Sequence, residues 1–202
     1  MMRRLVASTR NAHKLRELRR LLAPAGVRIL SLASFPPLPG VREDGDTLAD
    51  NAVKKAEAVC TALGLPALAD DSGLFVPALD GLPGVRSARY AGRGGDPANI
   101  RKLLRALAGK SGPARRAFFA AAVAVALPGR MTRVREGRIW GRITRAPRGT
   151  RGFGYDPIFQ PRGETRVFAE MRPEEKNRIS HRARALKKIA VMLRKAPDTQ
   201  TW

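Results

Sequence analysis

The first thirty residues follow an order of apolar and polar stretches that restricts the chain to a small set of folds. Leu5 to Ser8 is a short apolar stretch typical of a buried strand, and a polar loop follows from Thr9 to His13. Leucines then recur at helical spacing between residues 15 and 22, until Gly26 ends the pattern. Val27 to Leu30 is again strand-like. This order of strand, loop, helix and strand predicts an α/β fold.

The rest of the chain continues the alternation. Thr47 and Asp50 resemble a capping box and predict a helix that ends at Gly64. A strand over 67–69 is expected to end at Asp70 and Asp71, before a further extended stretch. The remaining predicted elements are a helix capped by Asp96, strands over 118–127 and 134–140, and a last helix over 183–194 that follows a break near residues 179–181.

Length and residue usage bound the class of protein. A chain of 202 residues fits one domain, and we expect a single domain over residues 1–202 with two lobes. The single cysteine, Cys60, excludes an internal disulfide and a multi-cysteine zinc site. The apolar run from Ala117 to Leu127 has about half of the roughly 20 residues that a membrane-spanning helix needs. We therefore expect no membrane span and a cytoplasmic location.

The chain is strongly basic, with a formal net charge of +22. The excess is greatest between residues 101 and 150, which contribute +12 of it. Such a field attracts polyanions, so nucleic acid, a membrane surface and a polyphosphate substrate are all candidate partners. A solvated basic surface without a partner would give the same composition, so the charge does not decide the function.

Two motifs for binding phosphate or RNA are incomplete. Gly109-Lys110-Ser111 resembles the end of a phosphate-binding Walker loop, but Leu104 stands where that loop needs its first glycine. The segment from Arg151 to Tyr155 copies the start of an RNA-recognition signature, and Asp156 and Pro157 then interrupt it. A basic RNA-binding protein is still an alternative. Because both motifs are incomplete, however, neither of them requires a nucleic-acid partner.

The scarce acidic residues point to a metal and phosphate site. Glu43 and Asp44 lie in a predicted loop, and Asp70 and Asp71 follow an apolar strand. Ligands of open α/β sheets bind at the carboxyl ends of strands, and Mg²⁺ commonly uses one or two carboxylates together with phosphate oxygens. Lys14 opens a helix after a strand and a loop, which favours anion binding at the helix start.

Six segments, in order along the chain, resemble motifs of the inosine triphosphate pyrophosphatase (ITPase) family, whose members remove deaminated purine nucleotides. The segments are Ser8–Lys14 with the following Leu-Arg-Glu-Leu, Glu43–Ala56, Ala69–Leu74, Pro83–Gly92, Gly149–Phe159 and Glu175–Arg182. The resemblance extends from residue 5 to about residue 194. Four residues depart from the family's usual pattern and leave details of the phosphate loop open: Arg10, His13, Asp50 and Phe118.

The resemblance implies a fold and a reaction. The fold would be α/β, an elongated mixed β-sheet flanked by helices, with two lobes, a central substrate cleft and assembly into a homodimer. The reaction would be Mg²⁺-dependent hydrolysis between the α- and β-phosphates of ITP, dITP or XTP, which yields the nucleoside monophosphate and pyrophosphate. A Maf-like pyrophosphatase that acts on dTTP or UTP is the alternative within the same class of enzyme.

The resemblance also implies roles for individual residues. Asp71 would be the general base and would hold Mg²⁺ together with Glu43. Phe153 would stack on the base, and cationic donors near it would read the 6-oxo acceptor, which adenine replaces with an amino donor. The residues implied to contact the substrate are Thr9, Arg10, Asn11, Ala12, His13, Lys14, Lys55 and Ser72 at the phosphates, Phe153, Asp156, Lys176, His181 and Arg182 at the base, and also Gly154 and Tyr155.

Overall fold

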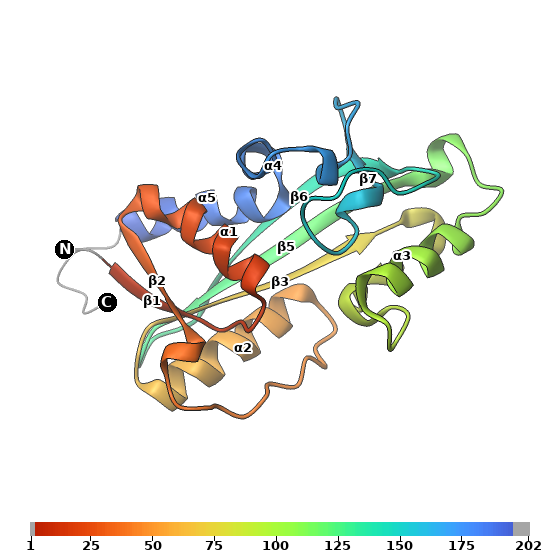
Figure 1. The fold of residues 1–202 in the computed structure, drawn as a ribbon. Helices are drawn as coiled ribbons and strands as arrows, with labels where there is room; N and C mark the ends of the chain where they lie inside the picture. The colour runs from red at the N-terminus through yellow and green to blue at the C-terminus, as the bar shows by residue number, and fades with distance from the viewer. Residues whose placement is uncertain (1–2, 196–202) are drawn as a thin grey trace. The chain divides into compact units, whose positions relative to one another are not determined.

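A computed structural model describes residues 3–195 and shows one sheet of seven strands with helices packed on it (Figure 1). The strand order is β2-β1-β3-β5-β6-β7, and β4 pairs with β3. β1 pairs in parallel with β2 and β3, whereas β4 and β7 pair antiparallel with β3 and β6. The predicted mixed α/β sheet flanked by helices is therefore confirmed.

The elements have the following bounds. The strands are β1 (Arg3–Ala7), β2 (Val27–Ser31), β3 (Ala67–Phe75), β4 (Pro83–Gly84), β5 (Arg116–Ala126), β6 (Arg133–Ile143) and β7 (Phe159–Pro161). The α-helices are α1 (Ala12–Leu22), α2 (Leu48–Leu63), α3 (Gly95–Ala106), α4 (Pro173–Ile179) and α5 (His181–Lys195). The 3-10 helices are η1 (Ala23–Ala25), η2 (Leu32–Ser34), η3 (Pro77–Leu79), η4 (Ser87–Arg89), η5 (Gly112–Arg115), η6 (Asp156–Ile158) and η7 (Phe168–Glu170). Across residues 3–195, no helix has both the length and the apolar character that crossing a membrane requires.

Local sequence signals set the ends of the first two helices. The helical stretch that begins with α1 stops at Gly26, whose φ of 72° is a left-handed conformation that glycine adopts without strain. Thr47 and Asp50 form the predicted capping box at the start of α2. Gly64, with φ of 63°, ends α2 as predicted. These caps fix where α2 begins and ends, and Lys55 lies on the buried face of the helix.

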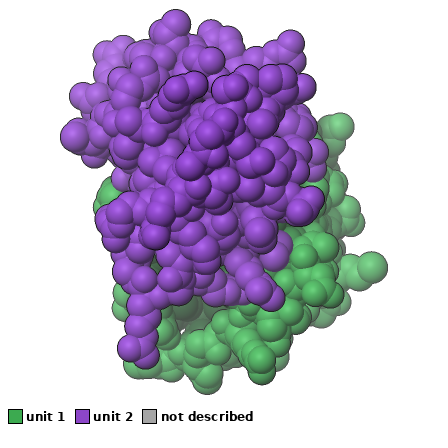
Figure 2. Space-filling model, turned by 90° about the vertical axis from the view of Figure 1, so that its right-hand side faces the viewer, with its two compact units in different colours: residues 1–71, 121–137, 182–202 green, residues 72–120, 138–181 purple. Residues whose placement is uncertain are grey.

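The described part of the chain divides into two compact units (Figure 2). Unit 1 contains the residues up to Asp71, residues 121–137 and the residues from Arg182 onward, and unit 2 contains residues 72–120 and 138–181. The chain changes from one unit to the other within β3, β5 and β6, and again after His181, the first residue of α5.

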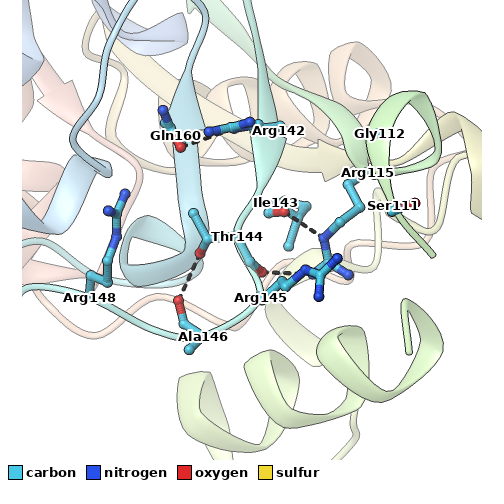
Figure 3. A pocket seen from close by; sticks show the side chains of 10 residues that line it. All are labelled: Ser111, Gly112, Arg115, Arg142, Ile143, Thr144, Arg145, Ala146, Arg148 and Gln160. Carbon is cyan, nitrogen blue, oxygen red and sulfur yellow. Dashed lines mark hydrogen bonds between the residues drawn. The ribbon is translucent and has the colours of Figure 1, made fainter. Parts of the chain in front are cut away.

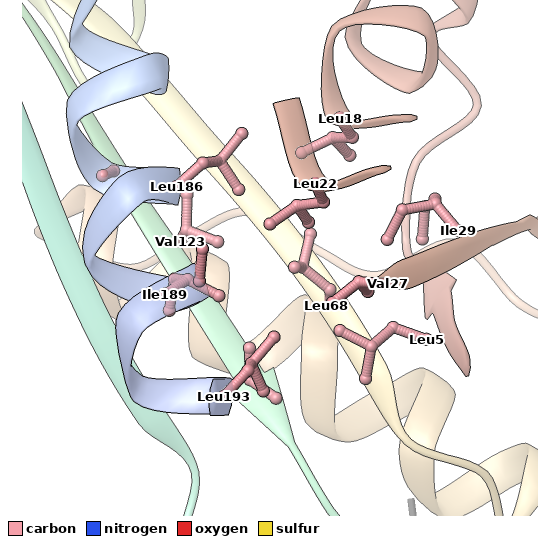
Figure 4. Packing of buried hydrophobic residues seen from close by; sticks show 14 of the residues in the cluster. Leu5, Leu18, Leu22, Val27, Ile29, Leu68, Val123, Leu186, Ile189 and Leu193 are labelled. Atoms are coloured by element: carbon pink, nitrogen blue, oxygen red, sulfur yellow. The ribbon is translucent and has the colours of Figure 1, made fainter. Parts of the chain in front are cut away.

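Unit 1 has its own aliphatic core, in which α1 and α5 pack on strands of the sheet (Figure 4). Leu18 and Leu22 of α1 and Ile189 of α5 surround Leu68 of β3 and Val123 of β5, and each of these side chains is buried. The face of β3 that carries Leu68 is therefore the face that meets α1 and α5.

Unit 2 has a separate core that is rich in aromatic rings. Phe119 of β5 lies 4.7 Å from Phe159 and 6.1 Å from Phe168, measured between ring centroids. Leu103 of α3 and Ile143 of β6 belong to the same buried cluster. The core holds the segment from η6 to η7 against the sheet.

Two predictions of detail are wrong. Asp70 and Asp71 do not end a strand, because β3 continues to Phe75 and pairs there with β4. Gly73 permits this pairing, since a Cβ at that position would lie 2.3 Å from the backbone oxygen of Gly84. Asp96 does not cap α3, because the N-cap is Gly94 and the helix begins two residues earlier than predicted, so the aspartate lies inside its first turn.

Candidate active site

Asp70 and Asp71 point to opposite faces of β3, because side chains alternate along a strand. Asp70 shares its face with Leu68, so it meets residues of α1 and α5. Arg182 of α5 binds it in a bidentate way, with Nε 3.0 Å from Oδ1 and Nη2 3.0 Å from Oδ2. The Nζ atom of Lys14, on α1, lies 3.1 Å from Oδ2 of Asp70.

This ion pair keeps Asp70 ionised. Burial raises the pKa of its carboxyl group, but the charges of Arg182 and Lys14 outweigh that effect and hold the pKa well below its usual range. Glu17 of α1 also binds Nη1 of Arg182. Asp70 is thus a fully engaged carboxylate that joins α1, β3 and α5, and it is not a candidate proton acceptor.

Asp71 faces the other way and meets α2. Lys55 of α2 places its Nζ atom 2.8 Å from Oδ1 of Asp71 and 3.3 Å from Oε1 of Glu43. Burial raises the pKa of Asp71, and the nearby Lys55 offsets only part of this effect. A buried carboxylate with a raised pKa is better suited to accept a proton than an ordinary one. We refer to Lys14, Glu43, Lys55, Asp70 and Asp71 as the carboxylate–lysine cluster.

The donor set of this cluster fits a Mg²⁺ ion. Glu43 and Asp71 both contact the same ammonium group, so their oxygens converge on one small volume. Between residues 3 and 195, no group of three or more His, Cys, Asp or Glu side chains could hold a metal by itself. Mg²⁺ takes one or two carboxylates from a protein and completes its shell with water and phosphate oxygens, so the pair Glu43 and Asp71 matches its ligand preference. Asp44 is not part of this set, because it pairs with Lys54 at 2.8 Å.

The loop before α1 is predicted to hold phosphates, and part of its backbone is already engaged. The amides of Thr9, Asn11 and His13 donate to Ala7 O, to Oγ1 of Thr9 and to Oδ1 of Asn11, respectively. The amides of Arg10 and Ala12 have no acceptor in the part of the chain that the structure describes. These two amides and the ammonium group of Lys14 are therefore the donors that a phosphate could use here.

The two unusual residues of this loop, Arg10 and His13, make contacts of their own. Nη2 of Arg10 donates to the backbone oxygen of Leu38 at 2.9 Å. Nδ1 of His13 lies 2.9 Å from Nη2 of Arg16. Both side chains are exposed, so neither occupies an interior position near the carboxylate–lysine cluster.

A second group of predicted site residues comes together in unit 2. Lys176 of α4 is buried and places its Nζ atom 2.6 Å from Oδ2 of Asp156. The same ammonium group lies 4.8 Å from the ring centroid of Phe153 and 5.5 Å from that of Phe168. Oδ2 of Asp156 also accepts from the backbone amide of Phe153 at 3.0 Å. We refer to Phe153, Asp156, Phe168 and Lys176 as the aromatic–lysine cluster.

Glycines give the loop of this cluster its shape. At Gly152, with φ of 81°, a Cβ would lie 2.0 Å from Oδ2 of Asp156, so only glycine fits. The amide of Gly154 donates to Oδ2 of Asp96 at 2.6 Å. Asp96 thereby anchors the loop to α3, a role that no local pattern indicated. Because this hydrogen bond attaches the loop to α3, the loop can hold the Phe153 ring in a defined position.

Three more residues that were predicted to contact the substrate have partners in the protein interior. The hydroxyl of Tyr155 donates to Ser87 O at 2.9 Å, and burial raises the pKa of this phenol. The ring of His181 stacks on that of Phe119, with centroids 4.7 Å apart and planes inclined by 12°. Arg182 is 1% exposed and is bound by two carboxylates, which favours a structural role over base reading. Ser72 follows Asp71 in β3 and is half-buried.

Comparison with known proteins agrees with this arrangement. The sequence profile of the Ham1 family matches residues 5–192. A dITP/XTP pyrophosphatase of Streptomyces coelicolor is 50% identical over 196 residues, which cover 96% of this chain and 98% of the relative. A dITP/XTP pyrophosphatase of Geobacillus kaustophilus is 53% identical over 189 residues, which cover 93% of each chain.

Solved structures give the same result. A HAM1 protein from Coxiella burnetii superposes with a TM-score of 0.87 at 39% identity, and the match covers 96% of this chain and 100% of that one. A nucleoside-triphosphatase, named as a dITP/XTP pyrophosphatase, from Mycobacterium abscessus has a TM-score of 0.76 at 45% identity, with 94% and 99% covered.

Proposed function

Because the chain belongs to the Ham1 family, we propose that it hydrolyses deaminated purine nucleoside triphosphates (ITP, dITP and XTP) to the nucleoside monophosphate and pyrophosphate. The resemblance read from the sequence motifs is confirmed by the family match, and the relatives do not favour the Maf-like alternative. The observation that carries the proposal is the buried Asp71 carboxylate, held beside Glu43 by the ammonium group of Lys55. An assay that measures pyrophosphate and orthophosphate separately, for a panel of nucleotides with Mg²⁺, tests it.

The carboxylate–lysine cluster supports the chemistry at the phosphates. Asp71 accepts a proton from water, whose oxygen attacks the α-phosphorus as the bond to the bridging oxygen of the leaving pyrophosphate breaks. The raised pKa of Asp71 favours this transfer at neutral pH. Lys14 and Lys55 supply positive charge to the phosphate oxygens, which stabilises the charge that builds on the leaving group. Ser72 and the amides of Arg10 and Ala12 are further donors in this proposal.

Glu43 and Asp71 are the residues that would hold Mg²⁺. When bound, the ion neutralises charge on the leaving pyrophosphate. We expect Glu43→Gln to raise the Mg²⁺ concentration for half-maximal rate about tenfold or more, since the amide keeps the shape but loses the ligand charge. The measurement is ITP turnover against Mg²⁺ concentration.

The matched control for this substitution is Asp44→Asn, in the same loop. Asp44 pairs with Lys54 and lies outside the carboxylate–lysine cluster, so its metal titration should match that of the wild type. Equal titrations for Glu43→Gln and the wild type would contradict the assignment of Glu43.

The aromatic–lysine cluster supports recognition of the base. Phe153 offers a ring for stacking, and the ammonium group of Lys176, which lies beside that ring, is the N–H donor that we assign to the base. A 6-oxo purine presents an acceptor to such a donor, whereas adenine presents an amino group and leaves the donor unsatisfied. His181 and Arg182 are assigned to the base by the resemblance alone, and for Arg182 the contacts favour another role.

Base reading by Lys176 predicts a change in specificity. We expect Lys176→Met to lower the ratio of kcat/KM for ITP to that for ATP on the order of 10- to 100-fold, because a charge-assisted hydrogen bond contributes about 1.5–3 kcal/mol. The ratio is insensitive to partial unfolding, since both substrates meet the same folded fraction. Lys110→Met, at an exposed lysine, is the control and should leave the ratio unchanged. Parallel losses for ITP and ATP would refute the assignment.

We propose further that the enzyme is a cytoplasmic homodimer, as the resemblance implies. One chain has a mass of 22.0 kDa, so light scattering on a sizing column should give twice that mass. A mass of a single chain at micromolar concentration would contradict the dimer.

A further inference from the structure

Unit 2 contains a cavity of about 460 Å³ whose charged lining residues are all arginines (Figure 3). Arg115 reaches it from η5, Arg142 from β6, and Arg145 and Arg148 from the segment that follows β6. No Asp or Glu is among its lining residues. We refer to it as the arginine pocket. It shares no residue with the carboxylate–lysine cluster or the aromatic–lysine cluster.

Arg115 is the buried member of this group and is only 8% exposed. Its guanidinium donates to backbone oxygens alone: Nε to Ile143 at 2.8 Å, Nη2 to Thr144 at 2.7 Å, and Nη1 to Leu107 at 2.9 Å and Lys110 at 3.4 Å. A guanidinium has five N–H groups, so at least one remains for another acceptor. Across residues 3–195, no carboxylate forms an ion pair with Arg115.

The neighbouring arginines add positive charge to this site. The guanidinium groups of Arg115 and Arg145 lie beside each other (Figure 3). Burial lowers the pKa of Arg115, and the charge of Arg145 lowers it further. Arg142 donates to the uncharged amide of Gln160 at 3.0 Å, and within the described residues neither Arg142 nor Arg145 has a carboxylate partner. Arg148 alone is partly neutralised, by Glu170 at 3.7 Å.

The charge environment of Arg115 differs from that of Arg182, the other arginine that is buried among the described residues. Arg182 is compensated by two carboxylates, Asp70 and Glu17. Arg115 is also a buried side chain, but among the described residues its hydrogen-bond acceptors are all backbone carbonyls and none is a carboxylate. A desolvated cation without a counter-charge is unfavourable, and a like charge beside it increases the cost. A bound anion would remove both penalties.

The lining indicates the class of anion. Guanidinium groups bind phosphate oxygens in a bidentate way, and several of them around one cavity suit a group with more than one phosphate. No aromatic side chain lines the cavity, so it offers no stacking surface for a base. We propose that the arginine pocket is a binding site for a small oligophosphate, such as pyrophosphate or tripolyphosphate, separate from the site of hydrolysis. The proposal does not depend on the proposed function.

Calorimetric titration of the full chain with tripolyphosphate tests the site by measuring its affinity. The titration is carried out in the presence of EDTA. The variant carries Arg142→Ala and Arg145→Ala, both at exposed positions, so that the fold is retained. The control carries Arg93→Ala and Arg101→Ala, which remove the same charge from exposed positions of unit 2 outside the pocket. We expect the pocket variant to lose at least tenfold in affinity at one binding site, and the control to lose less than twofold.

A further variant and a competitor complete the test. Lys14→Ala, which alters the carboxylate–lysine cluster, should leave this binding site intact. A single-stranded oligonucleotide, added at an equal concentration of phosphate groups, should not displace tripolyphosphate from it. Equal losses in the pocket variant and the control would overturn the proposal, because they would indicate only a general effect of charge. Displacement by the oligonucleotide would also overturn it, since an open basic surface would then explain the binding.

Discussion

Asp71→Asn is expected to lower kcat for ITP by at least about 100-fold while leaving the protein folded. The asparagine oxygen can still accept from Lys55, whose Nζ atom now lies 2.8 Å from Oδ1, so the packing between α2 and β3 should persist. What the substitution removes is the basicity and the negative charge of the side chain. A positioned general base contributes roughly 10²- to 10⁴-fold to the rate, and loss of a metal ligand adds to the effect.

The control for this experiment is Asp44→Asn, which makes the same chemical change at an exposed ion pair with Lys54. It should turn over ITP at nearly the wild-type rate. Circular dichroism and thermal unfolding should show both variants folded. If Asp71→Asn retained more than about a tenth of the wild-type kcat, Asp71 would not be the base, and the proton would have to leave by another route.

Arg182→Ala is expected to destabilise the protein by about 3–5 kcal/mol, because it leaves a buried carboxylate without its partner. Asp70 has a fully buried side chain and, among residues 3–195, would keep only Lys14 as an ion-pair partner. The effect should appear in urea unfolding as a lower midpoint with an unchanged slope. Arg184→Ala, two residues further along the same helix and exposed, should change the stability by less than about 0.5 kcal/mol.

The same variant separates the two roles considered for Arg182. If the residue mainly anchors Asp70, the ratio of ITP to ATP hydrolysis by the folded fraction should stay within about twofold of the wild type. If it mainly reads the base, the ratio should fall on the order of 10- to 100-fold while the unfolding midpoint changes little. The second outcome would contradict the structural role that the contacts favour.

Regular elements were the most predictable part of the fold, because their signals are local. Thr47, Asp50 and Gly64 fix the ends of α2 through contacts within a few residues, and all three were read correctly from the sequence. The break before the last helix was also correctly placed, since α4 ends at Ile179 and α5 begins at His181. Neither β7 nor α4 was predicted as a separate element, and both are short.

The opposed directions of Asp70 and Asp71 could not be predicted from the residues alone. Their adjacency indicated a shared site at a strand end, whereas β3 continues and its pleat sends one carboxylate to each face. Arg182 lies 112 residues away from Asp70 in the chain, so no local pattern indicates that ion pair. The contact between Asp96 and Gly154 was missed for the same reason. Motif resemblance named the residues of the site, and tertiary packing decides what each one touches.

The central claim is that the enzyme splits deaminated purine nucleoside triphosphates between the α- and β-phosphates. Its most direct test is a panel of ITP, XTP, ATP, GTP, dTTP and UTP with Mg²⁺, in which pyrophosphate and orthophosphate are measured separately. The account predicts that ITP and XTP give pyrophosphate and the monophosphate, with kcat/KM at least about 100-fold above that for ATP. Release of orthophosphate, or a preference for dTTP or UTP, would contradict it.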